Sequence, residues 1–123
     1  MRDQVGIHVK GLFGSLLFLG IALLALAGPA RGEECLVVHK VEITFEDATG
    51  FKPQSLVIEP GDCVRWVNVD LIDHSVVADD RSFRAGMMQT GADAIVAFTK
   101  PGDYSYFCGP HPPMRGEVIV EQQ

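Results

Sequence analysis

The stretch GDYSYFCGPHPPMRGEVIV, residues 102–120, decides the fold and points to the chemistry of this chain. It begins with one strand-like run, DYSYF, and ends with another, GEVIV, so the residues between them form a connecting loop. The loop carries a thiol at Cys108, an imidazole at His111 and a thioether at Met114, at intervals of three residues. Three prolines between these positions restrict its backbone. Packing explains one such side chain, but this spacing indicates a ligand that all three contact.

A thiolate, an imidazole and a thioether form a soft ligand set that selects copper over hard cations. In type 1 (blue) copper sites, two histidines and one cysteine form a plane, with a weak axial methionine. The loop therefore supplies three of the four ligands, and a second histidine must come from elsewhere. His8 lies in the N-terminal leader, and His39 lies in the first strand, where we assign it no role. We expect His74 to complete the set.

The region upstream of this loop reads as short strands separated by turns. In CLVVHKVEITFE, residues 35–46, Val41, Ile43 and Phe45 alternate with polar residues, which is typical of a half-buried strand. Further strand-like runs are SLVIE (55–59), CVRWVNV (63–69), HSVVAD (74–79) and AIVAFT (94–99), and we expect a loop over residues 80–93. No segment shows ten residues of helical periodicity, so the fold class is all-β, an antiparallel-rich sandwich or barrel.

The first third of the chain has a different composition. A start that carries Arg2 and Lys10 precedes an uncharged apolar run over residues 11–27, and small residues follow in ALAGPARG. This is the pattern of a secretory signal peptide. We therefore divide the chain into a signal peptide over residues 1–32 and an exported domain over residues 33–123.

The cleavage site is expected after Ala27, Ala30 or Gly32. The apolar run of 17 residues is close to the lower limit for crossing a bilayer, which takes about 20 residues, so an uncleaved membrane anchor is the alternative. Cys35 does not fit a lipid attachment site, because Glu33 and Glu34 stand where small residues are needed.

Charge and cysteine count limit the partners and the compartment. Residues 33–123 hold seven Lys or Arg and fifteen Asp or Glu, a formal charge of 7 − 15 = −8, which argues against nucleic acid as a partner. An oxidising compartment permits disulfides. Since Cys108 belongs to the ligand group, Cys35 and Cys63 are the natural pair, provided that the fold brings them together.

These motifs resemble the plastocyanin and amicyanin family of cupredoxins. The resemblance rests on HSVVADDRSF, on PGDCVRWVN and on residues 102–120, and it covers nearly all of residues 36–121. The Cys-x2-His-x2-Met spacing is similar to the short ligand loop of amicyanin. The resemblance implies a Greek-key β-sandwich of about eight strands, with one copper ion near one end. The copper ligands that it implies are His74, Cys108, His111 and Met114.

The resemblance also implies that the first and third strands are parallel neighbours. A Cys35–Cys63 disulfide would then lie at the end remote from copper and stabilise the domain by roughly 3 kcal/mol. Two positions depart from the family. Ser75 stands where amicyanin has an asparagine that orders the ligand loop, and Cys63 stands where the family usually has threonine. We expect Trp66 to lie in the core and Met87 and Met88 to pack near the site.

The expected function is that of an exported, monomeric type 1 copper protein. Its one copper ion would alternate between Cu(I) and Cu(II), carrying single electrons between a redox protein donor and acceptor that dock transiently near His111. The expected location is the periplasm, and contact with a membrane is expected only if the leader stays uncleaved, which would tether the domain to the outer side of the cytoplasmic membrane.

Two alternatives remain open, a periplasmic copper chaperone or storage protein and a cupredoxin subunit of a larger redox complex. The closed set of two imidazoles, one thiolate and one thioether argues against the chaperone. We do not expect an enzyme, because a copper nitrite reductase needs a second metal site, for which this chain has neither the length nor the spare histidines.

Overall fold

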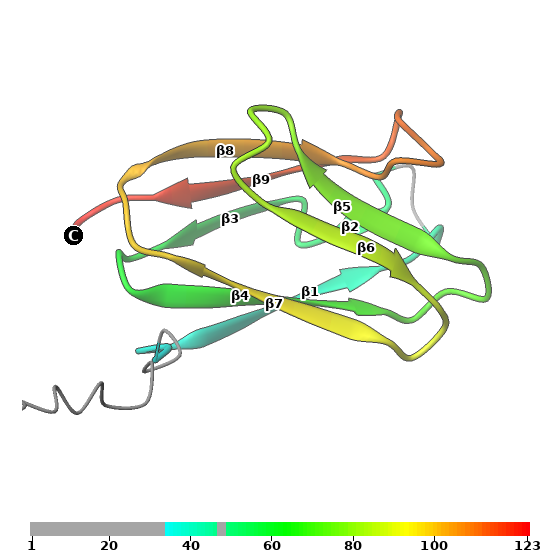
Figure 1. Cartoon of the computed structure of the whole chain (residues 1–123), viewed down its shortest axis with the longest axis horizontal. Coiled ribbons are helices and arrows are strands. Elements are labelled where there is room, and N and C mark those ends of the chain that lie inside the picture. Colours follow the sequence, from blue (N-terminus) through cyan, green and yellow to red (C-terminus); the bar gives the residue numbers. More distant parts are fainter. Residues whose placement is uncertain (1–33, 47–48) are drawn as a thin grey trace, which may run out of the picture. The chain divides into compact units, whose positions relative to one another are not determined.

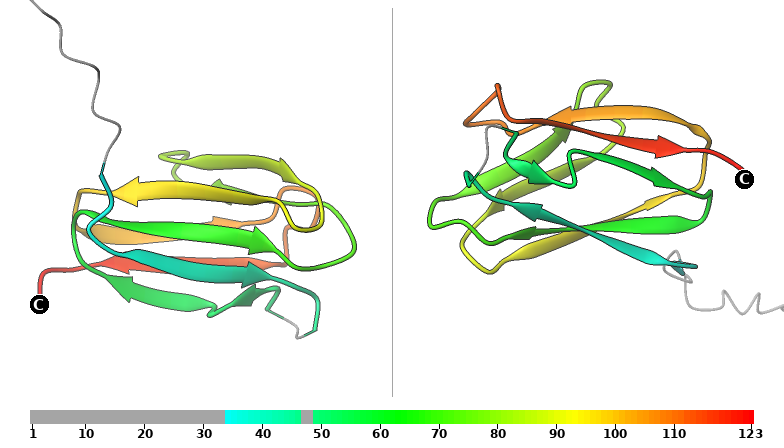
Figure 2. Two further views of the ribbon diagram at one scale, coloured as in Figure 1. Left: turned by 90° about the horizontal axis from the view of Figure 1, so that it is seen from below. Right: turned by 180° about the vertical axis from the view of Figure 1, so that it is seen from behind.

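Two β-sheets packed face to face form the fold (Figures 1 and 2). The computed structural model describes residues 34–46 and 49–123. Among these residues, no helix is long and apolar enough to cross a membrane. One sheet contains, in spatial order, β2 (Phe51–Lys52), β1 (Val38–Ile43), β4 (Asp62–Asn68) and β7 (Asp93–Phe98). The other contains β3 (Ser55–Ile58), β9 (Arg115–Val120), β8 (Gly102–Phe107), β5 (His74–Ala78) and β6 (Arg84–Met88). The expected signal peptide lies outside the described residues.

Alternation along β4 shows how the sequence builds the core. Val64 and Trp66 face inward and are fully buried, whereas Arg65 between them is exposed. Trp66 stacks on Phe83 at 5.6 Å between ring centroids and meets Tyr106 edge-on at 5.4 Å. Aromatic pairs of this geometry stabilise a core beyond the area that they bury. The expected all-β sandwich and the buried Trp66 are thus confirmed.

The structure differs from the expected strands in three places. The described residues form nine strands where about eight were expected, because the two residues of β2 pair with the end of β1. Residues 84–88, expected as loop, form the edge strand β6, which pairing with β5 stabilises despite a central glycine. Phe45, expected on the buried face of the first strand, lies beyond its end, since β1 stops at Ile43.

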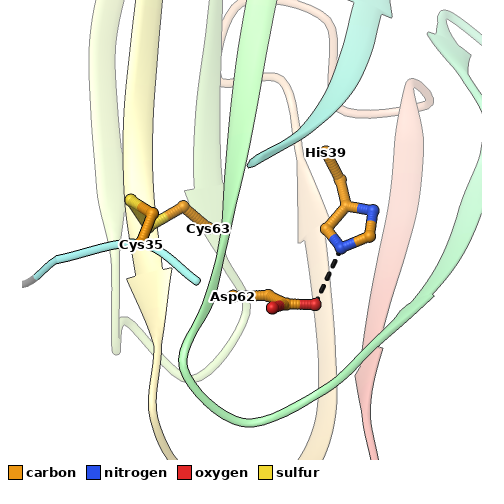
Figure 3. Close-up of a disulfide and its surroundings, with 4 residues drawn as sticks. All are labelled: Cys35, His39, Asp62 and Cys63. Carbon is orange, nitrogen blue, oxygen red and sulfur yellow. Dashed lines mark hydrogen bonds and ion pairs between the residues drawn. A yellow bond between two sulfur atoms is a disulfide. The ribbon is translucent and has the colours of Figure 1, made fainter. Parts of the chain in front are cut away.

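The first and third long strands are parallel neighbours, as the resemblance implied: β1 pairs with β4 over six residues, from Val38–Cys63 to Ile43–Asn68. This register places Cys35, three residues before β1, beside Cys63 near the start of β4. The two cysteines form a disulfide with their Cα atoms 5.4 Å apart (Figure 3). The predicted Cys35–Cys63 pair is therefore confirmed, and Cys108 remains the free, buried thiol among the described cysteines.

His39, expected as a strand surface residue, makes a specific contact beside this disulfide (Figure 3). It is half-buried, and its Nε2 lies 2.8 Å from the carboxylate of Asp62. The backbone N–H of Glu59 donates to the same carboxylate at 3.2 Å. These hydrogen bonds, above all the one with His39, hold the pKa of the buried Asp62 below its usual range. The pair thus ties the β3–β4 turn to β1.

Candidate metal centre

Segments far apart in the sequence meet at one end of the sandwich. His74 is the first residue of β5, and Cys108 directly follows β8. His111 and Met114 lie in the loop that leads from β8 to β9, drawn in orange in Figure 1. The parallel pairing of β1 and β4 places the disulfide at the starts of these strands, whereas the site lies beyond the end of β4. The two features therefore occupy opposite ends of the sandwich.

The side chains of His74, Cys108 and His111 converge on one point. Their ligand atoms all lie within 4.8 Å of one another. The Nδ1 atoms of His74 and His111 are each 3.6 Å from the sulfur of Cys108. His74 and Cys108 are fully buried, whereas His111 is partly exposed. These three residues, which the sequence singled out, are thus positioned as a metal site.

The spacing of these atoms fits a metal ion bound among them. Histidine nitrogen binds zinc at about 2.0 Å and cysteine sulfur at about 2.3 Å. For a metal of similar size, these bond lengths put nitrogen and sulfur about 3.5 Å apart at a tetrahedral angle and about 3.7 Å apart at a trigonal angle. The two distances of 3.6 Å lie between these values. The pocket therefore has the dimensions of a metal site with one thiolate and two imidazoles.

Backbone hydrogen bonds fold the loop so that residues three apart share one side. The N–H of His111 donates to the carbonyl of Cys108 at 3.2 Å, and the N–H of Met114 donates to the carbonyl of His111 at 2.9 Å. The N–H of Cys108 donates back to the carbonyl of Met114 at 3.1 Å. The loop is thus closed on itself, which explains the three-residue interval between its soft side chains.

Met114 is buried against the backbone of Gly50. A Cβ atom at Gly50 would lie 2.4 Å from the Met114 Cε, and Gly50 has a φ of 76°. Both observations require glycine there. This close approach restricts the Met114 side chain, and the place of Met114 beside the three converging ligands stays a prediction.

Two residues that the sequence did not single out orient the imidazole of His74: Asp70 contacts it directly, and Asn68 in turn holds Asp70. The Nε2 of His74 lies 2.9 Å from the carboxylate of Asp70, so its Nδ1 faces the thiol. Hydrogen bonds, with that of His74 the largest influence, hold the pKa of Asp70 below its usual range. Asn68 is fully buried and accepts a bond from the N–H of Asp70 at 2.9 Å. A carboxylate behind a metal-ligating histidine fixes its orientation, and the short distance in sequence from Asp70 to His74 was the available signal.

Ser75 makes hydrogen bonds with Cys108 and with the adjacent Gly109. The N–H of Ser75 points at the sulfur of Cys108 at 3.4 Å, and the Ser75 hydroxyl accepts the N–H of Gly109 at 2.9 Å. Met88 lies opposite His74 in the β5–β6 pair and is buried, whereas Met87 is exposed. The expectation of packing near the site is thus met by Met88 and not by Met87.

Comparison with known proteins adds sequence relatives. Residues 37–121 match the family described as copper binding proteins, plastocyanin/azurin family. The chain is 39% identical over 71 residues to amicyanin of Paracoccus versutus, which covers 54% of each chain. It is 33% identical over 124 residues to plastocyanin of Synechococcus sp., covering 86% of this chain and 87% of that protein. The chain spans between 54% and 64% of the length of the three amicyanins that it matches.

Solved structures share the fold. The purple cupredoxin of Nitrosopumilus maritimus superposes with a TM-score of 0.62 at 29% identity, covering 67% of this chain and 98% of that one. The copper-containing nitrite reductase of Thermus scotoductus superposes with a TM-score of 0.61 at 29% identity. That match covers 73% of this chain but 23% of the enzyme, so the likeness concerns one part of the larger protein.

Proposed function

The chain belongs to the plastocyanin/azurin family of copper-binding proteins, and from this membership we propose that it is an exported type 1 copper protein that carries single electrons between larger redox proteins. The single observation that carries the proposal is the convergence of His74, Cys108 and His111, whose ligand atoms lie within 4.8 Å of one another. Relatives named amicyanin and plastocyanin support it.

We propose His74, Cys108, His111 and Met114 as the residues that hold the copper ion. When bound, the ion supplies a centre that accepts and releases one electron. Cys108 would provide a buried thiolate, His74 and His111 would each offer an imidazole Nδ1 atom, and Met114 would add a thioether. The protein's own task is to keep these groups in place in both oxidation states. The hydrogen bond between the His74 imidazole and the Asp70 carboxylate and the one that the Gly109 N–H donates to the Ser75 hydroxyl serve that task.

Electron exchange is proposed to occur at a surface that we call the histidine face, made of His111, Phe45, Leu71, Ile72 and the three loop prolines. Leu71 is 88% exposed, and Phe45 and Ile72 are each nearly half-exposed. His111 is the proposed ligand that reaches this surface. An apolar face of limited area suits weak, short-lived complexes, which in electron transfer typically bury less than about 1,200 Å². The donor and acceptor are therefore expected to dock here in turn.

A carrier role is proposed in preference to catalysis, with the domain over residues 33–123 exported, to the periplasm in a Gram-negative source. The nitrite reductase match covers 23% of that enzyme, whereas the plastocyanin match covers 87% of that protein. If the leader remains attached, the same domain would act as a carrier tethered to the outer side of the cytoplasmic membrane.

The first test is the visible absorption spectrum of residues 33–123 titrated with Cu(II). We expect an intense band in red light that saturates at one equivalent, bleaches with ascorbate and is absent in Cys108→Ser, because that variant lacks the thiolate. Met87→Leu is the matched control, since it removes an exposed sulfur at the same end of the domain and should keep the band. A wild-type protein that stays pale, or that only oxidises its thiol, would reject the blue-copper assignment and leave copper carriage as the better explanation.

A further inference from the structure

Phe45 contacts both proposed histidine ligands, although it lies neither on β5, which carries His74, nor in the loop that carries His111. Its ring centroid is 5.1 Å from that of His74 and 5.2 Å from that of His111, with interplanar angles of 68° and 83°. The two imidazoles are themselves 5.1 Å apart at 57°. The phenyl ring therefore lies edge-on against both imidazoles at once, with 47% of the residue exposed to solvent.

The backbone around Phe45 is fixed from several sides. The N–H of Thr44 donates to the carbonyl of Gly50 at 3.1 Å, and the N–H of Glu46 donates to the hydroxyl of Thr44 at 3.2 Å.

These contacts limit how the imidazoles can move. Edge-to-face aromatic pairs are favourable at ring separations of about 4.5–7 Å, so tilting either imidazole away from Phe45 loses a favourable contact. His74 is fully buried and also held by Asp70, but His111 sits on a loop and is partly exposed. Among the side chains whose contacts with His111 are described, Phe45 is the exposed one, whereas His74 and Cys108 are fully buried. Removing the ring would open a path from solvent to the nitrogen and sulfur atoms behind it.

We propose that Phe45 is a positioning residue of the metal site. It holds the planes of both imidazoles before and after metal binding, and it closes the histidine side of the site to small anions. The proposal rests on the proposed function for the metal, but its contacts exist in the apoprotein and can be tested there.

The test compares wild type with Phe45→Ala in two forms of the protein. In the apoprotein, imidazole NMR signals of His111 should be sharp in wild type and broadened by exchange in Phe45→Ala. In the Cu(II) protein, azide should leave the visible and EPR spectra of wild type unchanged and should shift those of Phe45→Ala in a saturable way. Apparent Cu(II) affinity should fall about tenfold, because imidazoles that are no longer held in the apoprotein must be ordered when the metal binds.

Two further variants separate this role from general exposure or instability. Phe45→Tyr keeps the ring and should behave as wild type in every measurement. Leu71→Ala removes an apolar side chain that is still more exposed on the same face, and it should neither broaden His111 nor admit azide. Sharp His111 signals together with azide resistance in Phe45→Ala would overturn the proposal, and so would equal azide binding by Leu71→Ala.

Failure of the proposed function would look different. In that case wild type would form no copper chromophore, while the apoprotein NMR comparison would still decide whether Phe45 orders the two imidazoles.

Discussion

Ser75, at the position where the resemblance implies an asparagine, makes a contact that its short side chain can reach. Its hydroxyl accepts the N–H of Gly109 at 2.9 Å, across the gap between β5 and the ligand loop. A Cβ atom on Gly109 would lie 2.9 Å from the same oxygen, closer than side chains tolerate. The contact therefore needs both the short side chain of serine and the absence of a side chain at glycine. It holds in place Gly109, the residue that follows Cys108.

We therefore predict that Ser75→Ala weakens the site without unfolding the domain. The Gly109 N–H loses its partner, which should lower the free energy of unfolding by about 1 kcal/mol. Copper affinity should fall by about tenfold, at the lower end for partners of metal ligands. Thermal denaturation of the apoprotein and competitive copper titration measure the two effects. Ser55→Ala is the control, since Ser55 is exposed on β3. An unchanged affinity in Ser75→Ala would contradict the role given to this contact.

At the scale of elements, the parallel β1–β4 pair organises the sheet that carries no ligand. Parallel neighbours cannot be joined by a tight hairpin, so the chain leaves β1, adds β2 and β3, and returns at the same end to begin β4. The Cys35–Cys63 disulfide closes this excursion, which spans 28 residues. The contact between His39 on β1 and Asp62 at the start of β4 provides a second link between these two strands (Figure 3).

Replacing both cysteines, Cys35→Ser with Cys63→Ser, should therefore destabilise the domain but spare its chemistry. Loss of the cross-link should lower the free energy of unfolding by about 3 kcal/mol, which for a domain of this size corresponds to a fall in Tm of about 12–24 °C. The copper spectrum at 25 °C should be that of wild type, because the disulfide lies at the far end of β4 from His74. Calorimetry and absorption on one sample measure both. A changed copper band in the double variant would show that the two ends are coupled.

At the scale of the whole described domain, the sandwich keeps its stabilising cross-link and its proposed electron-exchange surface at opposite ends. The histidine face gathers the loops that follow β1, β4 and β8, seen together on the right of Figure 1. The chain enters the fold at Cys35, at the other end. The first described residues of the chain therefore lie away from the proposed docking surface.

If partners meet this surface, a charge placed on it should slow electron exchange and leave the metal site intact. Self-exchange between Cu(I) and Cu(II) copies, measured by NMR line broadening, tests this without knowledge of the natural partners. Leu71→Lys should slow it at least about tenfold, because like charges then face each other in the encounter complex. Its visible spectrum should match wild type.

Val57→Lys is the matched control, because it introduces the same charge at an exposed position on β3. An equal slowing in both variants would mean that net charge, not the histidine face, governs the encounter. No slowing in Leu71→Lys would place the electron-exchange surface elsewhere.

The sequence by itself determined the features that are local in the chain. Cys108, His111 and Met114 follow one another at intervals of three residues in one loop between two strands, and Trp66 was expected in the core, where it is buried. His74 followed because few other histidines exist, and the disulfide followed from a resemblance that implied parallel neighbours. These inferences needed only chemistry, short spacing and one family pattern.

Only the tertiary structure decided what depends on contacts between distant segments. Asp70 behind His74, Gly50 under Met114 and Phe45 across both imidazoles come from loops that are ordinary in sequence. The edge strand β6 likewise exists because β5 pairs with it, in a stretch whose composition predicts a loop. Periodicity and spacing report on neighbours along the chain. The groups that orient a metal ligand are neighbours in space, and their positions are set by how the two sheets and their loops pack.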